Sequence, residues 1–289
     1  MEYISIQVLL DEAKRKKQRV YELVMAEQAA AAGVSETEIF AKMKKAYDTM
    51  NESVATGLQK KCALKIEQEG GAKIYKKYVD GGKSLLGKTF GLVVARAMAV
   101  SEVNASMGKI VAAPTAGSCG ILPASMLTIR DIYHLSDEKV IHSLFTASGV
   151  GMVIANVASI AGATGGCQAE CGTAQCMAAA AIVEMLDGTF EQMANAIAIS
   201  MQNIEGLVCD PVAELVECPC IKRNASGAVN AVLAADMALA GIKSIIPVDE
   251  VIMAVKQVGD IMDDRLKETA LGGLAVTPTG KKLKDKIFR

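Results

Sequence analysis

Three loop segments contain most of the residue types that could bind a metal or a substrate. They read APTAGSCG (113–120), GATGGCQAECG (162–172) and CDPVAELVECPCIKRNASG (209–227). Glycine and proline interrupt each segment, so the backbone rather than core packing directs its side chains, and loops held between rigid elements often carry binding groups. These three segments are where we expect the chemistry of this protein.

Thiols are the most reactive groups in these loops. The chain has eight cysteines, and isolated buried cysteines such as Cys62 and Cys176 are expected to act as small hydrophobic residues. The loop cysteines are different, because their surroundings favour metal binding; they are Cys167, Cys209, Cys218 and Cys220.

The spacing of the loop cysteines leaves more than one metal centre open. A structural zinc site commonly uses paired C-x-x-C units, which this sequence lacks, although the four loop cysteines could in principle supply four ligands. An electron-transfer iron-sulfur cluster also uses four thiolates. A cluster held by only three thiolates would leave one iron open, and an open metal ion acts as a Lewis acid on a substrate oxygen.

Composition excludes several other functions. The 289 residues carry a formal charge of −1 and only 4% aromatic residues, which gives little support for binding nucleic acid. The uncharged run from Ser143 to Ala169 is long, but its many glycines and hydroxylated residues favour a buried core helix over a membrane span. The N-terminal sequence lacks the pattern of a signal peptide, so we expect a cytoplasmic protein with reduced thiols.

The elements that position these loops are predicted to be helices. Long stretches rich in Ala, Met, Leu and Glu alternate with glycine or proline stops, and few segments have the alternation of strands. Ser35 with Glu38, and Thr189 with Gln192, form capping boxes. We predict one all-α, multi-helical domain over residues 1–289, with helices at 7–32, 35–59, 84–105, 121–133, 136–160, 170–186, 189–207, 226–240 and 249–265.

Residues 82–89, GKSLLGKT, match the phosphate-binding loop pattern G-x-x-x-x-G-K-T. Such a loop must leave a buried strand before it enters a helix, and the preceding KIYKKYVDG is too charged for a central strand. We therefore interpret the segment as a solvated turn followed by a helix start.

Four segments together resemble the iron-sulfur-dependent L-serine dehydratases, in particular their α chain. They are EVNASMGKIVAAPTAGSCGILP, GATGGCQAECG, CDPVAELVECPCIKRNASGAVNA and KETALGGLAVTPTG, in order between about Ser84 and Gly280. The resemblance implies an all-helical catalytic domain and a 4Fe-4S cluster held by three cysteines. Matched residue by residue, the ligands fall on Cys167, Cys209 and Cys220.

Two positions depart from the pattern of similar proteins. Glu214 stands where they have a small residue, and Cys218 stands where they typically have an apolar one. Cys218 is thus an extra thiol beside a ligand, and the resemblance gives it no role.

The resemblance implies elimination of water from L-serine to give pyruvate and ammonia, without pyridoxal phosphate. Polar loop residues are expected to bind the substrate. The paired N–H groups of an arginine guanidinium match a carboxylate, and hydroxyl and amide groups can add further hydrogen bonds. The expected substrate-binding residues are Thr115, Gly117, Ser118, Arg223, Asn224 and Lys267. For Arg223 and Asn224 the alternative is a salt bridge and cap at a helix start. Lys267 with Glu268 could order the C-terminal segment over the site, and the alternative for this pair is a solvated ion pair.

The general base is not identifiable from the sequence. The two histidines, His134 and His142, flank a predicted helix start and are expected to be surface or capping residues. Single-chain members of the family carry an additional β-type domain, so the chain resembles the α subunit of a two-chain enzyme whose β chain completes the site. Two alternatives remain: an L-cysteine desulfidase with a similar cluster, and a non-catalytic zinc or iron-sulfur scaffold.

Overall fold

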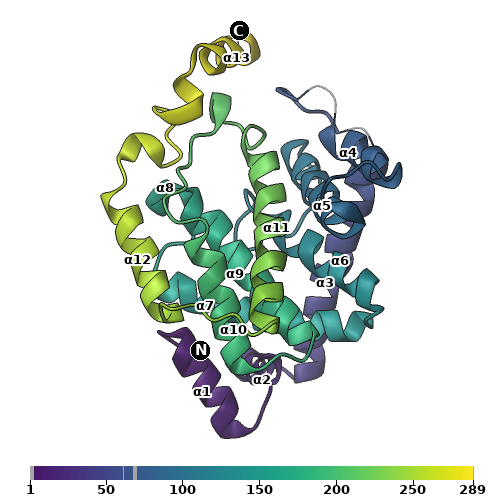
Figure 1. Ribbon diagram of the computed structural model, residues 1–289, viewed down its shortest axis with the longest axis vertical. Coiled ribbons are helices and arrows are strands. Elements are labelled where there is room, and N and C mark those ends of the chain that lie inside the picture. Colours follow the sequence, from purple (N-terminus) through teal and green to yellow (C-terminus); the bar gives the residue numbers. More distant parts are fainter. Residues whose placement is uncertain (1–2, 61, 68–69, 289) are drawn as a thin grey trace.

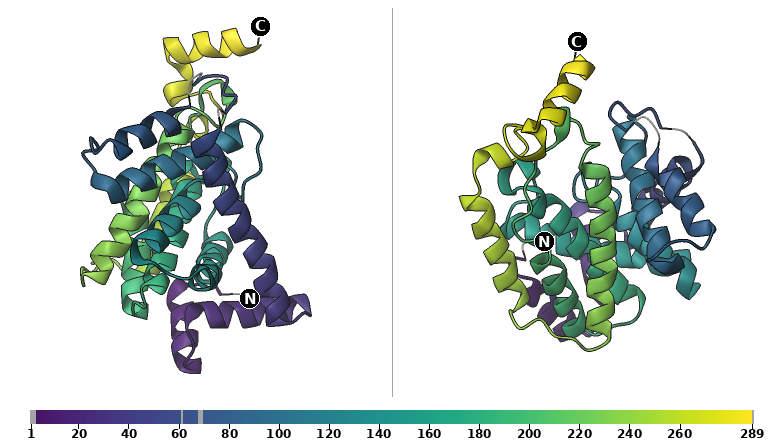
Figure 2. Two further views of the ribbon diagram at one scale, coloured as in Figure 1. Left: turned by 90° about the vertical axis from the view of Figure 1, so that its right-hand side faces the viewer. Right: turned by 45° about the horizontal axis from the view of Figure 1, so that its top comes forward.

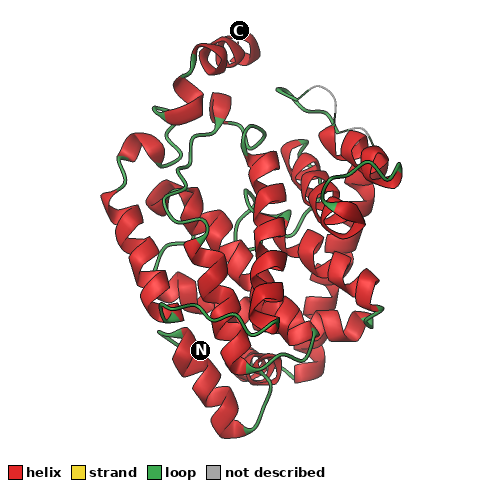
Figure 3. Ribbon diagram, viewed as in Figure 1, coloured by secondary structure: helices red, strands yellow, loops and turns green. Residues whose placement is uncertain are grey.

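The computed structural model describes residues 3–60, 62–67 and 70–288. Within these ranges the chain forms thirteen α-helices and three short 3₁₀ helices, and no strand (Figures 1 and 3). The predicted all-α fold is therefore confirmed. The bounds of the α-helices are α1 Ile6–Lys16, α2 Val20–Ala32, α3 Glu36–Gln59, α4 Gly71–Asp80, α5 Gly87–Ala105, α6 Ile121–Tyr133, α7 Asp137–Val157, α8 Gly162–Gly165, α9 Cys167–Met185, α10 Phe190–Gln202, α11 Cys220–Leu239, α12 Val248–Ile261 and α13 Pro278–Phe288.

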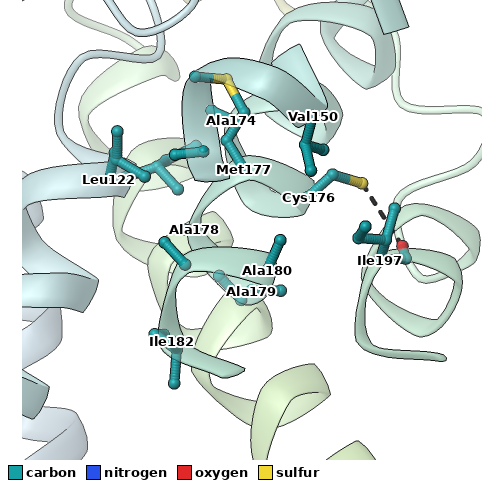
Figure 4. Packing of buried hydrophobic residues seen from close by; sticks show 14 of the residues in the cluster. Leu122, Val150, Ala174, Cys176, Met177, Ala178, Ala179, Ala180, Ile182 and Ile197 are labelled. Atoms are coloured by element: carbon teal, nitrogen blue, oxygen red, sulfur yellow. Dashed lines mark hydrogen bonds between the residues drawn. The ribbon is translucent and has the colours of Figure 1, made fainter. Parts of the chain in front are cut away.

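Helix α9 lies at the centre of the molecule, packed against α6, α7, α10 and α11. All of its residues are buried except Glu170, because small apolar side chains cover every face of the helix. Figure 4 shows part of this core, with a run of alanines that lets the neighbouring helices approach closely. The Cys176 thiol donates a hydrogen bond to the carbonyl oxygen of Ile197 at 3.4 Å, so the buried, structural role expected for Cys176 is confirmed.

A second layer of helices covers one side of this core. Helix α5 packs on α11, α3, α4 and α6. At Gly57 of α3 the backbones come so close that a Cβ atom would lie 2.2 Å from the carbonyl oxygen of Ala99. Figure 2 shows α1, α2 and the start of α3 at one end of the molecule, and α13 projecting from the opposite end.

Two long polar side chains tie the N-terminal helices to the core. The Glu184 carboxylate is 3% exposed and accepts hydrogen bonds from Thr146 Oγ1 at 2.9 Å and Arg19 Nε at 2.5 Å. Arg19 also caps α2, where its backbone N–H donates to the Glu22 carboxylate at 2.7 Å. Such pairing satisfies a charge that would otherwise be costly to bury.

The structure corrects the expected helix boundaries in several places. The single helix predicted over 7–32 is wrong, because Lys17 adopts a left-handed conformation, with φ 57°, that ends α1 and separates it from α2. Helix α11 begins at Cys220, six residues before the expected start at Ser226. Helices α4 and α13 were not predicted. Both capping boxes, at Ser35 and at Thr189, are confirmed.

The structure explains two misleading sequence patterns, the phosphate-loop match at 82–89 and the long apolar run that includes part of helix α7. The turn at 82–89 follows helix α4, not a strand, so it lacks the strand–loop–helix context of a phosphate-binding loop. Helix α7 is long and apolar enough to span a membrane by length and composition, but 61% of its most apolar window is buried inside the protein. Its contacts with α9 and α2 are those expected of a core helix.

Candidate metal centre and substrate cavity

The loops singled out by their composition meet at one cavity of about 610 Å³. Cys209 and Cys220 line it together with Thr115, Gly117 and Glu170, so each of the three predicted loop segments contributes residues to its lining. The fourth segment of the resemblance adds Glu268 and Thr269. Groups separated by up to about 150 residues in sequence thus face the same space.

Two of the three predicted cluster ligands open helices. Cys167 is the first residue of α9, after Gly166 with φ 76°, and Cys220 is the first residue of α11, after Pro219. The partial positive charge of a helix N-terminus favours a thiolate at this position. Both helices therefore present a sulfur in a setting suited to metal ligation.

The third predicted ligand, Cys209, is held in place by the C-terminal segment. Its N–H donates to the carbonyl oxygen of Leu266 at 2.8 Å, and its own carbonyl oxygen accepts from Glu268 N–H at 2.8 Å. This pairing is a parallel bridge of Cys209 with Lys267. It fixes the thiol and the Glu268 carboxylate on the same rim of the cavity.

Burial and neighbouring charges act differently on the three thiols. Burial raises the pKa of Cys220 to about 12, with a further contribution from the negative charge of Cys167. Burial also raises the pKa of Cys209. By contrast, the hydrogen bond with Cys171 and the nearby Arg223 guanidinium lower the pKa of Cys167. Cys167 is therefore the thiol most readily deprotonated in the absence of a metal.

The loop at residues 117–120, beside the cavity, is held against α11 by hydrogen bonds of Asn224. The Asn224 Oδ1 atom accepts from Gly120 N–H at 2.9 Å, and its Nδ2 atom donates to the carbonyl oxygens of Gly117 at 2.7 Å and Cys220 at 2.9 Å. Ser118 is fully buried in the same loop. Both polar atoms of the Asn224 amide are therefore occupied by the protein itself.

Arg223 links the cysteine loop to the C-terminal segment. Its guanidinium lies 2.8 Å from the Asp210 carboxylate and donates to the carbonyl oxygen of Val208 at 2.8 Å. Asp210 in turn accepts from Leu274 N–H at 2.7 Å, and Gly273 packs so closely that a Cβ would lie 2.3 Å from the Asp210 carboxylate. The salt bridge weighed as an alternative for Arg223 is thus present.

The remaining predicted residues occupy different places around the cavity. Thr115 and Gly117 line it, and Gly117 has no room for a side chain because a Cβ would lie 2.4 Å from Glu170. The Lys267 ammonium lies 3.4 Å from the Asp264 carboxylate and is not among the groups that line the cavity. Neither histidine lines it; the His142 ring stacks on Tyr21 with centroids 4.5 Å apart.

Two carboxylates of the site were missed in the sequence. Glu170 accepts a short hydrogen bond from the Thr115 hydroxyl, and burial together with the nearby Glu268 raises its pKa. Glu268 was expected only to order the C-terminal segment together with Lys267 or to form an ion pair with it, not to line the cavity. The spacing of Glu170, three residues after Cys167, could have indicated it, because positions i and i+3 share one face of a helix.

The two departures from the family pattern have distinct settings. Glu214 has φ 60°, the left-handed region that small residues adopt most easily, and its carboxylate pairs with Lys284 of α13 at 2.5 Å. Cys218 is half-buried, and its neighbour Glu217 accepts hydrogen bonds from the backbone of Lys65 and Ile66 at 2.8 and 2.7 Å. Glu217 thereby ties the cysteine loop to residues 65–67.

The fold and site define a class of protein: an all-helical domain whose thiols, from distant loops, surround a cavity that also holds carboxylates. Residues 15–275 match the family described as serine dehydratase alpha chain. This chain belongs to that family.

Individual relatives agree over almost the whole chain. It is 47% identical over 284 residues to a probable L-serine dehydratase, alpha chain, of Bacillus subtilis, covering 98% of this chain and 95% of that protein. It is 45% identical to the L-serine dehydratase, alpha chain, of Peptoniphilus asaccharolyticus, covering 97% of each. The L-serine dehydratase TdcG of Escherichia coli is 44% identical over 62% of this chain, which corresponds to 40% of that protein.

Proposed function

We propose that the chain is the α subunit of an L-serine ammonia-lyase, which eliminates water from L-serine to give pyruvate and ammonia. The observation that carries the proposal is the meeting of Cys209, Cys220 and Glu170 at one cavity, with Cys167 beside it, in a member of the serine dehydratase alpha chain family. L-serine is small enough to enter a cavity of about 610 Å³ that already has metal-binding groups on its wall.

The donor set fits a 4Fe-4S cluster held by Cys167, Cys209 and Cys220. Cys209 and Cys220 line the same cavity as Glu170, and the Cys167 sulfur lies within 4.8 Å of a Glu170 carboxylate oxygen, which supports an arrangement of the three sulfurs around one space. Gly162 leaves space next to the Cys209 sulfur, where a Cβ would lie only 3.1 Å away. When bound, such a cluster supplies an iron without a protein ligand, whose Lewis acidity favours departure of the serine hydroxyl group.

The protein's own groups would orient the substrate. Thr115 and Gly117 line the cavity and can contact a bound serine, whereas Ser118 and Asn224 hold their loop in shape. We assign Arg223 and Lys267 to the support of Asp210 and of the 264–268 segment around Cys209. Of the six residues predicted to bind substrate, we thus propose two as direct contacts and four as positioning residues.

Three carboxylates line the cavity, and two of them, Glu170 and Glu268, are candidates for exchanging a proton there, because the third, Glu214, is paired with Lys284. Burial and the charge of Glu268 raise the pKa of Glu170, so this carboxyl group takes up a proton more readily than an exposed glutamate does. We propose that Glu170, held by Thr115, handles a proton of the reaction, and that a partner chain completes the site.

A β chain of the serine dehydratase is the proposed partner, because the two relatives matched over their full length are named alpha chains. Exposed apolar side chains lie on the C-terminal segment, with Leu271 65%, Leu274 43% and Phe288 60% exposed. Helix α13 adjoins the cavity rim through Lys284 and Glu214. We propose that the β chain covers this apolar surface. We also propose that the two-chain enzyme is located in the cytoplasm.

The test is anaerobic co-purification with the β chain encoded by the same organism, followed by iron, sulfide and pyruvate measurements. We expect about four irons and four sulfides per chain, and pyruvate formation from L-serine that air abolishes before the protein unfolds. Sulfide release from L-cysteine in preference to pyruvate from L-serine would point to a desulfidase instead. Pyruvate formation that survives chelation and air would rule out the iron-dependent mechanism.

A further inference from the structure

Cys171 is a buried thiol that the proposed cluster does not use. It follows Cys167 by one helical turn on α9, and the two Sγ atoms are 3.3 Å apart. Its side chain is 1% exposed. Residues at i and i+4 lie on the same face of a helix, so the two sulfurs face each other because of the helix geometry itself.

Glu170 adds a third donor to this pair. One ligand atom from each of Cys167, Glu170 and Cys171 lies within 4.8 Å of the other two. Two thiolates bound to one tetrahedral zinc ion, each at about 2.3 Å, lie about 3.8 Å apart, which is close to the observed spacing of the sulfurs. Thiolate and carboxylate oxygen are both accepted zinc ligands.

We propose that the chain without its cluster binds one thiophilic divalent ion, such as Zn²⁺, through Cys167, Cys171 and Glu170. Binding releases the two thiol protons and involves no oxidation or reduction. The cavity in front of Glu170 leaves room for water as a fourth ligand. Cys209 and Cys220 take no part in this site.

The ion site has a consequence for the cluster, which rests on the proposed function. Cys167 belongs to both donor sets, so a chain that holds a single ion lacks one of the three thiolates needed for the cluster. Excess zinc should therefore compete with cluster assembly, and a chelator should relieve the competition. Cys171 decides this competition, because it belongs to the single-ion site alone.

The ion site is tested by titrating the reduced, cluster-free chain with Co²⁺ in the absence of air. We expect one ion per chain, a thiolate-to-cobalt charge-transfer absorption, and its displacement by Zn²⁺. Cys171→Ser should remove the absorption and weaken binding at least about tenfold. Cys176→Ser is the matched control, because Cys176 lies on the same helix, is equally buried and donates to the carbonyl oxygen of Ile197, away from the proposed ion site.

Three results of this titration would overturn the ion site: no thiolate absorption in the wild-type chain, unchanged binding in Cys171→Ser, or an equal loss in Cys176→Ser. Circular dichroism of each variant shows whether α9 is intact. A Glu170→Gln variant should bind Co²⁺ more weakly but keep the thiolate absorption, because both sulfurs remain.

A second experiment separates the ion site from the proposed function. The chain is reconstituted with iron and sulfide at increasing Zn²⁺, and cluster absorbance is recorded. We expect zinc to suppress the cluster in the wild type and much less in Cys171→Ser. Equal suppression in both would overturn the competition. If neither chain acquires a cluster without zinc, the proposed function fails, while the Co²⁺ titration still decides the ion site.

Discussion

At the scale of single residues, the three thiols of the proposed metal centre lie in unlike surroundings. Cys167 and Cys220 begin helices, whereas Cys209 is held by backbone pairing with Leu266 and Glu268. Composition indicated that the loop cysteines bind a metal, because the loops are rich in glycine and proline, but only the resemblance to a family implied these three thiols as the ligands. The roles proposed for Glu170 and Cys171 were missed, because each depends on the first turn of α9, which begins at Cys167 and not at the predicted residue 170.

Replacing any one proposed cluster ligand should abolish activity. Cys167→Ala, Cys209→Ala and Cys220→Ala are each expected to lower pyruvate formation by about a hundredfold or more, because a lost thiolate removes the cluster or its open iron. Iron and sulfide content should fall in parallel. Cys218→Ala is the matched control and should retain both; full activity in any of the three ligand variants would contradict the assignment.

Cys119 makes the stability of the cluster-free chain sensitive to high pH. Burial raises its pKa to about 12, while an unfolded thiol titrates near about 8.5. Above about pH 9 the unfolded chain loses a proton that the folded chain keeps, so stability falls as pH rises, by up to about 3 kcal/mol at pH 11 from this thiol.

Denaturant unfolding of the cluster-free chain at about pH 8 and pH 11 checks this effect. Between these two pH values, the free energy of unfolding of Cys119→Ala should fall by about 2 to 3 kcal/mol less than that of the wild type. Ser125→Ala, which changes a buried side chain that does not titrate, is the control and should follow the wild type. Identical pH dependence in the wild type and Cys119→Ala would show that Cys119 is not the source.

At the scale of elements, local signals predicted some boundaries well and missed others. Helix α6 has the predicted bounds, and the capping boxes at Ser35 and Thr189 mark the helix starts. The start of α11 at Cys220 was missed, because the Cys-Pro-Cys sequence has the composition of a loop, although proline often precedes or opens a helix. The break at Lys17 was missed because lysine rarely adopts a left-handed conformation.

The Arg19–Glu184 pair should stabilise the attachment of α2 to the core. Arg19→Ala leaves the buried Glu184 carboxylate without its strongest partner and is expected to lower the free energy of unfolding by about 2 kcal/mol. Chemical denaturation measures the change. Arg15→Ala, whose partner Glu12 lies on the surface, should cost less than about 0.5 kcal/mol. Equal losses of unfolding free energy in Arg19→Ala and Arg15→Ala would mean that Arg19 contributes no more than a surface residue does.

At the scale of the whole molecule, no local pattern could predict which loops meet. The segments around Thr115, Glu170, Cys209 and Glu268 are far apart in sequence, and only the packing of α9 and α11 brings them to one cavity. The resemblance to a family substituted for this missing information. It implied three thiols as ligands, but it did not indicate that Glu170 lines the same cavity.

Helix α13 should matter for assembly more than for folding. Gly280 is its only buried residue, so removing residues 278–289 is expected to change the midpoint of thermal unfolding by less than about 2 °C. The same truncation should weaken binding of the β chain at least about tenfold, measured by calorimetry.

An exposed apolar residue far from α13 serves as the control for the truncation. Ile245 is 90% exposed in the connection between α11 and α12, and Ile245→Ser should leave β-chain binding unchanged. Undiminished binding by the truncated chain would place the β chain on another surface.

The backbone bridge between Cys209 and Lys267 also sets an order of events during synthesis. The full cavity requires residues up to Thr269, so the three proposed cluster ligands can be arranged around it only when the ribosome has made nearly the whole described chain. Cys167 and Cys171 need only one turn of α9 and can meet much earlier. If both proposed centres exist, a newly made chain would offer the two-sulfur site before the three-sulfur one, and the supply of free metal ions at that moment would influence which centre forms.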